Sequence, residues 1–191
     1  MVRLFLAISL PDEVKARLSA LQKELARSGA DVRWVRPEGI HLTLKFFGEV
    51  SEVMINPLAE TAKRVVEATK PGVIHLGVKG MGTFPAGARP RVVWAGLVGD
   101  LQRLARLQHQ LENAFAQLGF APEKRPFVPH LTLGRVKSGR RVDHLLRSLK
   151  RYEDEEFASP QEIEVKDLVL YQSTLKPSGA VYTPLRRVSL V

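Results

Sequence analysis

The sequence His41-Leu-Thr-Leu44 occurs a second time, unchanged, as His130-Leu-Thr-Leu133. Each copy follows a strand-like run and then a helix that ends at a glycine, and the strand-like runs begin at Arg3 and Arg91. The two histidines are 89 positions apart (130 − 41), and the two strand starts are 88 apart (91 − 3). A spacing kept over a whole unit indicates duplication rather than chance. The sequence therefore predicts one β-α-β unit that is used twice.

The apolar pattern around the repeats predicts alternating helices and strands. Apolar residues recur at helical spacing in four stretches, within residues 11–29, 56–70, 100–119 and 143–149. Strand-like runs lie between them, and the last two, at 163–172 and 181–190, resemble a hairpin. This mixture is typical of an α+β fold with antiparallel sheets. Because no linker separates the halves, we expect residues 1–191 to form a single domain of two closely packed lobes, each with one repeated tetrapeptide (41–44 or 130–133).

Composition limits the class of protein and its partners. With 45% hydrophobic and 26% charged residues, the 191-residue chain has the composition of a soluble globular protein. It has no cysteine, which excludes disulfides and thiolate metal sites. The net charge of +9 favours a polyanionic partner such as RNA, and the alternative is a merely solvated basic surface. No apolar run is long enough for a signal peptide or a membrane helix, so we expect a cytoplasmic protein.

The repeated tetrapeptides combine an apolar face with a polar face. In a strand, residues two apart point to the same side, so His41 and Thr43 share one face and the leucines occupy the other. The same holds for His130 and Thr132. If a pseudo-twofold axis relates the two copies, both polar faces line one groove, which then holds two imidazoles and two hydroxyls.

Two histidines in one groove are suited to acid–base catalysis near neutral pH. One imidazole accepts a proton while the other, protonated, donates one. In-line displacement at phosphorus needs this arrangement, with a base behind the attacking oxygen and an acid at the leaving oxygen. The hydroxyls of Thr43 and Thr132 are candidates for hydrogen bonds to the phosphate oxygens. We expect no metal and no cofactor, because no cluster of carboxylates or histidines has the spacing of a ligand set.

Two basic residues near the motifs are candidates for contact with phosphate or RNA. By strict alternation Lys45 shares the face of His41, and the alternative is that it is only solvated. Arg135 falls on the face opposite His130 unless a β-bulge intervenes, so its role stays open. The aromatic residues, Phe46 among them, are expected in the core rather than as platforms for stacking bases.

The chain also resembles the 2H phosphoesterases and, among them, the RNA 2′,3′-cyclic phosphodiesterases, historically called 2′-5′ RNA ligases. The resemblance covers nearly the full length. It is carried by the paired His-x-Thr-x motifs and their flanks, among them Arg3-Leu-Phe-Leu-Ala-Ile8, Trp34-Val35, His41-Leu-Thr-Leu-Lys-Phe-Phe-Gly-Glu49, Pro129-His-Leu-Thr-Leu-Gly-Arg135 and Tyr171-Gln-Ser-Thr174.

This resemblance implies a bilobal fold with a central cleft, helices on the outside, and hydrolysis of RNA 2′,3′-cyclic phosphate ends to 2′-phosphates. It also implies that His41 is the proton donor and His130 the proton acceptor, an assignment that residue types alone leave open. Related proteins join or cut 2′-5′ linkages in tRNA halves. We expect a monomer acting on RNA. The alternatives are a phosphodiesterase for small cyclic esters such as ADP-ribose cyclic phosphate, a non-catalytic RNA-binding protein, and a histidine-metal hydrolase.

Overall fold

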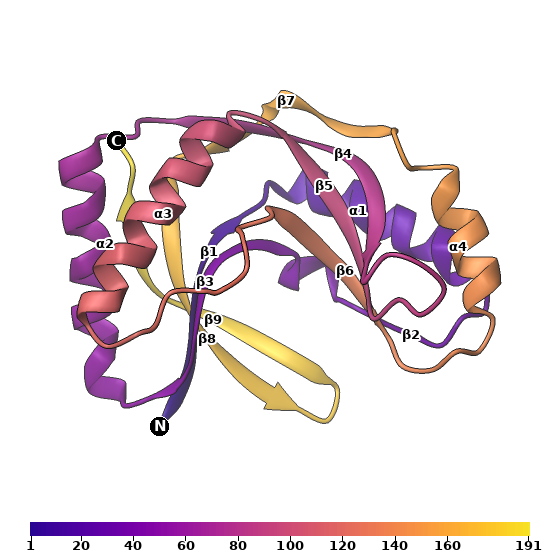
Figure 1. The fold of residues 1–191 in the computed structure, drawn as a ribbon, viewed down its shortest axis with the longest axis horizontal. Coiled ribbons are helices and arrows are strands. Elements are labelled where there is room, and N and C mark those ends of the chain that lie inside the picture. The colour runs from indigo at the N-terminus through magenta and orange to yellow at the C-terminus, as the bar shows by residue number, and fades with distance from the viewer.

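Each repeated tetrapeptide opens a strand, and the two strands belong to different antiparallel sheets in the computed structural model, which describes all 191 residues (Figure 1). The first sheet has the order β3-β1-β8-β9, with β1 (Val2–Ser9), β3 (His41–Val50), β8 (Asp167–Lys176) and β9 (Gly179–Ser189). The second has the order β2-β6-β5-β4-β7, with β2 (Val32–Trp34), β4 (Ile74–Phe84), β5 (Val92–Gly99), β6 (His130–Val136) and β7 (Glu156–Val165). The predicted α+β class with antiparallel sheets is confirmed.

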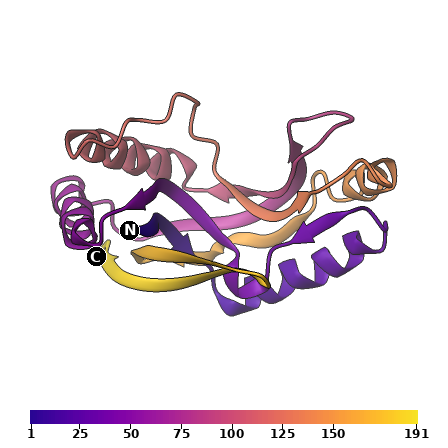
Figure 2. The same cartoon turned by 90° about the horizontal axis from the view of Figure 1, so that it is seen from below.

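Four α-helices cover the outer faces of these sheets (Figures 1 and 2). They are α1 (Asp12–Ala26), α2 (Ile55–Thr69), α3 (Leu101–Gln117) and α4 (Val142–Lys150). A short 3₁₀ turn, η1 (Pro37–Gly39), lies between β2 and β3, and a second, η2 (Glu52–Met54), lies between β3 and α2. None of these helices is long and apolar enough to cross a membrane.

The two halves of the chain exchange helices. Helix α1 follows β1 of the first sheet but lies against β7 and α4 on the second. Helix α3 follows β5 of the second sheet but packs on α2 and on β3 of the first sheet as well as on β4 of the second, and the rings of Phe47 and Phe115 meet edge to face, 4.8 Å between centroids. Figure 1 shows the result, with α2 and α3 beside the first sheet and α1 and α4 beside the second. The sequence repeat predicts the β-α-β units but does not reveal this crossing.

The exchange produces one continuous hydrophobic core. A single cluster of 39 buried residues draws on both sheets and all four helices. The apolar stripe of α1, which includes Val14 and Leu18, is buried, as is the stripe of α3 from Leu104 to Phe115. Helical spacing of leucines therefore predicted the buried faces of both crossing helices correctly.

Both motif strands carry a β-bulge three residues after the histidine. In β3 the register with β1 passes from Thr43 to Lys45, so Leu44 has no partner residue in β1. In β6 the register with β5 passes from Thr132 to Gly134, so Leu133 is likewise unpaired. A bulge inserts one residue and shifts the alternation of side chains that follow it. Beyond the bulge of β6, and in β3 as far as Phe47, where the register with β1 shifts a second time, the sides of the strand are the reverse of those that strict alternation predicts.

Candidate active site

One cleft is lined by both repeated motifs. Its volume is about 270 Å³, and its walls include His41, Thr43, His130 and Thr132. The side chains reach the cleft because residues two apart share a face of a strand, while the leucines between them are buried on the other face. The structure thus brings together the four motif side chains that the sequence analysis singled out.

Each histidine is oriented by a carbonyl two residues before it. The Nδ1 atom of His41 lies 2.7 Å from the carbonyl oxygen of Gly39, and the Nδ1 atom of His130 lies 2.7 Å from that of Val128. A carbonyl oxygen only accepts, so Nδ1 carries the proton and Nε2 is the nitrogen left to exchange one. The neutral His41 then accepts a hydrogen bond at Nε2 from the Thr43 hydroxyl, at 2.9 Å. Both imidazoles are therefore held in the same tautomer.

Aromatic rings enclose His41 more than they enclose His130. The ring of Phe5 stacks on it with centroids 4.7 Å apart, and Tyr182 meets it edge to face at 5.2 Å. Burial lowers the pKa of His41 below its ordinary value, the carbonyl of Gly39 opposes this shift, and the positive charge of Lys15 adds to it. Phe84 packs edge-on against His130, at 5.0 Å. His41 is therefore neutral over a wider pH range in the free protein than an ordinary histidine.

The two bulges decide which further residues reach the cleft. In β6 the bulge turns Arg135 to the side of His130, where it lines the cleft, so the alternative that a bulge intervenes is the one that holds. In β3 the bulge turns Phe46 into the cleft, with 43% of its surface exposed. The expectation of Phe46 in the core is wrong for this reason.

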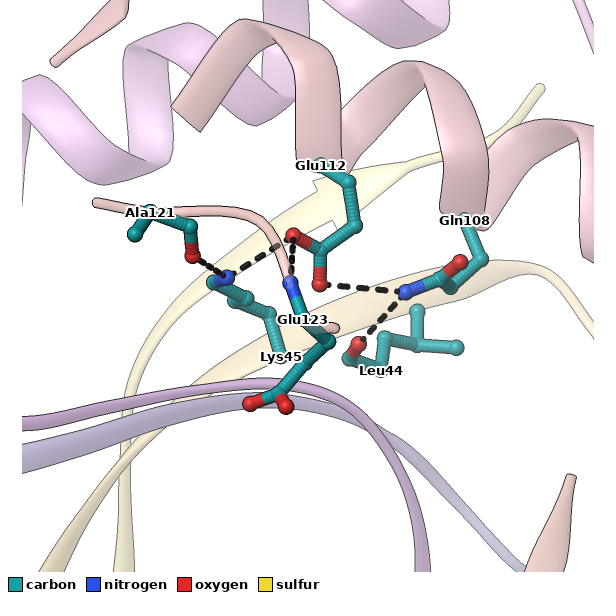
Figure 3. A network of polar contacts seen from close by, with 6 residues as sticks. All are labelled: Leu44, Lys45, Gln108, Glu112, Ala121 and Glu123. Atoms are coloured by element: carbon teal, nitrogen blue, oxygen red, sulfur yellow. Dashed lines mark hydrogen bonds and ion pairs between the residues drawn. The ribbon is translucent and has the colours of Figure 1, made fainter. Parts of the chain in front are cut away.

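Lys45, in contrast, faces the interior. Only 4% of its surface is exposed, and its ammonium group donates to the Glu112 carboxylate and to the Ala121 carbonyl, both at 2.8 Å (Figure 3). The same carboxylate accepts from the backbone N–H of Glu123 and from the Gln108 amide. The prediction that Lys45 shares the face of His41 and contacts phosphate is therefore wrong, because the bulge at Leu44 reverses the side on which it lies.

The cleft also contains residues that the sequence analysis did not single out. Arg3 lines it from β1, and its guanidinium lies 4.8 Å from the centre of the Phe46 ring. Ser173 and Tyr182 line it from β8 and β9. Their approach depends on the C-terminal hairpin joining the first sheet beside β1, and no local pattern in the sequence signals that pairing.

Comparison with known proteins defines the class of the protein. The family model of the 2′-5′ RNA ligase superfamily matches residues 10–176. The chain belongs to this superfamily, as the motif resemblance implied. Two relatives, both named RNA 2′,3′-cyclic phosphodiesterase, come from Methanothermobacter thermautotrophicus (35% identity, covering 96% of each chain) and Thermotoga maritima (38%, covering 96% of this chain and 93% of the relative).

Solved structures show the same fold. A Thermus thermophilus protein superimposes with a TM-score of 0.77 at 29% identity, covering 98% of this chain and 97% of its own. E. coli LigT in complex with 3′-AMP superimposes with a TM-score of 0.76 at 28% identity, over the same shares of the two chains. The bilobal fold implied by the motifs is thus shared with these proteins.

We predict that removing Lys45 destabilises the protein strongly. Lys45→Met leaves the Glu112 carboxylate buried without its cation, and such losses cost about 3–5 kcal/mol. Urea denaturation measures the change in the free energy of unfolding. The matched control is Lys63→Met at the exposed Lys63–Glu67 pair, where we expect no measurable change. Equal effects of the two substitutions would contradict the buried role of Lys45.

We predict that His41 titrates below pH 6.5, the ordinary value, because its imidazolium is poorly solvated. NMR titration of the ring protons measures the midpoint. Because the folded pKa lies below the unfolded one, the contribution of His41 to stability is complete above pH 6.5 and falls as the pH drops towards the folded pKa. Tyr182→Ala opens one side of the ring and should raise the midpoint. A wild-type midpoint at or above the ordinary value would refute this description.

Proposed function

We propose that the protein is a metal-independent phosphodiesterase that opens the 2′,3′-cyclic phosphate at an RNA end and leaves a 2′-phosphate. The observation that carries the proposal is the pair of histidines on one cleft, each oriented by a carbonyl through Nδ1 so that Nε2 serves for proton transfer. The relatives are named for this activity, and E. coli LigT, which has the same fold, has been solved with a nucleotide.

In the proposed reaction the two imidazoles have opposite roles. His130 takes a proton from water as its oxygen attacks phosphorus, the bond from phosphorus to the 3′ oxygen breaks, and His41 gives its proton to that oxygen. Once protonated, the buried His41 is a stronger acid than an ordinary imidazolium, since burial lowers its pKa. The negative charge of a bound phosphate favours the imidazolium, so substrate binding raises the protonated fraction of His41.

The remaining polar groups of the cleft are suited to hold the phosphate. Thr43 and Thr132 present hydroxyls beside the two histidines, and Arg135 presents a guanidinium. Neither Arg135 nor Arg3 forms an ion pair with a carboxylate, so both charges are free to meet an anion. Donors aimed at the non-bridging oxygens stabilise the charge that develops in the transition state. All these groups come from one chain, so a monomer suffices for the reaction.

Two hollows that continue from the cleft favour RNA over a small cyclic ester. One shares Thr43, Phe46 and His130 with the cleft and carries Lys124 and Arg125. The other shares Arg135 and Tyr182 with it and is lined by Arg33 and Arg36 as well. Basic side chains on both sides are what the backbone of a nucleic acid requires.

The same groups also support joining. If a 5′-hydroxyl replaces water, His130 activates it in the same way and a 2′-5′ linkage forms, and reversal of these steps cuts it. We include this reversible joining of cytoplasmic RNA ends, tRNA halves among them, as an accessory activity of the proposed function.

The direct test is an end-group assay. An RNA oligonucleotide with a 2′,3′-cyclic end is incubated with the protein in EDTA, and chromatography distinguishes 2′- from 3′-phosphate products. We expect the 2′-phosphate, with a bell-shaped dependence of the rate on pH. His41→Ala and His130→Ala should each lower the rate by about 10²–10⁴.

The control for these variants is His144→Ala, which removes an exposed histidine of α4 and should leave the rate unchanged. Circular dichroism checks that all three variants fold. Hydrolysis abolished by EDTA would indicate a metal enzyme, and binding of RNA without turnover would leave only a binding protein. A 3′-phosphate product would show that the bond from phosphorus to the 2′ oxygen breaks instead of the bond to the 3′ oxygen.

We predict that the hollow with Lys124 and Arg125 holds further RNA phosphates. Replacing both residues with glutamate should weaken RNA binding. The decrease of log affinity with log salt should become less steep, by about 1 for each phosphate that the variant no longer binds. Hydrolysis of a cyclic mononucleotide, too short to reach these residues, is the control and should not change. If the variant affects both substrates equally, or the wild type prefers the mononucleotide, a small cyclic ester becomes the better candidate substrate.

A further inference from the structure

The β-bulges at Leu44 and Leu133 each accept a hydrogen bond from a buried glutamine of the opposite half of the chain. The amide of Gln22 in α1 donates to the carbonyl of Leu133, the bulged residue of β6, at 2.9 Å. The amide of Gln108 in α3 donates to the carbonyl of Leu44, the bulged residue of β3, at 3.2 Å. The two contacts are reciprocal, because each crossing helix reaches the motif strand of the other half.

A bulge in the interior needs such a donor. Leu44 and Leu133 are buried and lack partner residues in β1 and β5, so their carbonyl groups need donors from elsewhere, which are Gln108 for Leu44 and both Gln22 and the Val35 N–H for Leu133. A buried carbonyl left without one is costly. The two glutamines are themselves only 5% and 7% exposed, although each lies on the apolar side of an amphipathic helix. Burying a polar side chain in such a place costs free energy unless it is hydrogen-bonded.

The two bulges decide which side chains of β3 and β6 face the cleft. Without the bulges, strict alternation would turn Lys45 and Gly134 towards the substrate and Phe46 and Arg135 away from it. With the bulges, Phe46 and Arg135, each five residues after a motif histidine, line the cleft. The bulges therefore determine which groups the substrate meets beyond the histidines and threonines.

We propose that Gln22 and Gln108 are a matched pair of positioning residues for catalysis. Gln22 holds the bulge of β6 and thereby sets Arg135 in the cleft, and Gln108 holds the bulge of β3 and sets Phe46. The proposal rests on the proposed function, since it treats the cleft as the site that binds the phosphate and its nucleoside.

The two bulges differ in the groups that surround them. The Gln22 amide makes two hydrogen bonds, to the Leu133 carbonyl at 2.9 Å and to the Val35 carbonyl at 2.8 Å. The Leu133 carbonyl also accepts a hydrogen bond from the Val35 N–H. Gly134 follows this bulge, and a Cβ there would lie 2.6 Å from a Val32 methyl group, so no side chain fits. At the other bulge, Lys45 occupies the equivalent place and its partner Glu112 accepts from Gln108 at 3.2 Å.

The test is a set of double-mutant cycles with Gln→Met, which keeps the length of the side chain and removes the donor. Gln22→Met and Gln108→Met are each combined with Arg135→Ala and with Phe46→Ala. The readouts are kcat and KM for an RNA oligonucleotide with a 2′,3′-cyclic end. Thermal unfolding is followed for every variant, so that loss of stability is separated from loss of positioning.

We expect Gln22→Met to lower kcat/KM by about tenfold in the wild type but by less than about twofold when Arg135 is already alanine. Gln108→Met should couple in the same way to Phe46→Ala. The crossed pairs, Gln22→Met with Phe46→Ala and Gln108→Met with Arg135→Ala, should be multiplicative. This pattern of coupling would not arise from a general loss of stability.

Multiplicative effects within both matched pairs would overturn the proposal. If Gln22→Met does not fold, Gln22→Glu, which also replaces the donating group, takes its place in the cycle, and failure of both to fold would show that the residue is only structural. A wild-type protein that does not hydrolyse the substrate refutes the proposed function. An active wild type with multiplicative cycles refutes only the role of the glutamines.

Discussion

The exchange of helices between the two sheets is the constraint on which the rest of the structure depends. The first half contributes motif strand β3 to the first sheet and helix α1 to the second, and the second half contributes motif strand β6 to the second sheet and helix α3 to the first. Because burial of apolar surface is the main force that stabilises a fold, the cover of each sheet is complete only with a helix from the other half, α3 on the first sheet and α1 on the second (Figure 1). The common core of 39 residues follows from this, and so does the fixed approach of β3 to β6 across the cleft.

The cleft combines two imidazoles with unpaired positive charge. Some basic side chains elsewhere in the protein are paired with carboxylates, as Arg17 is with Glu162 and Lys45 with Glu112. Arg3 and Arg135 have no such partner and lie beside two imidazoles in a partly enclosed space. Coulomb interactions are stronger there than in open water, so an anion that enters gains more than it would on the surface. The burial that lowers the pKa of His41 is part of the same enclosure.

Much of this site could be predicted from the sequence, because a repeated motif and a period of two are local signals. The pairing of His41 with Thr43 and of His130 with Thr132 required no knowledge of tertiary contacts. The side on which Lys45 lies was predicted wrongly, and that of Arg135 was left open, because a bulge depends on partners distant in the sequence. Gln22 and Gln108 were not recognised, since a glutamine on an apolar stripe has no distinctive pattern until its acceptor is known.

The crossing of α1 and α3 also restricts how the molecule can move. To swing the two sheets apart, one helix would have to leave the sheet it covers and expose its leucines to water, a penalty far above thermal energy. The two lobes are therefore joined through one packed apolar interior, and the cleft lies between parts of a single core rather than between two separately folded bodies.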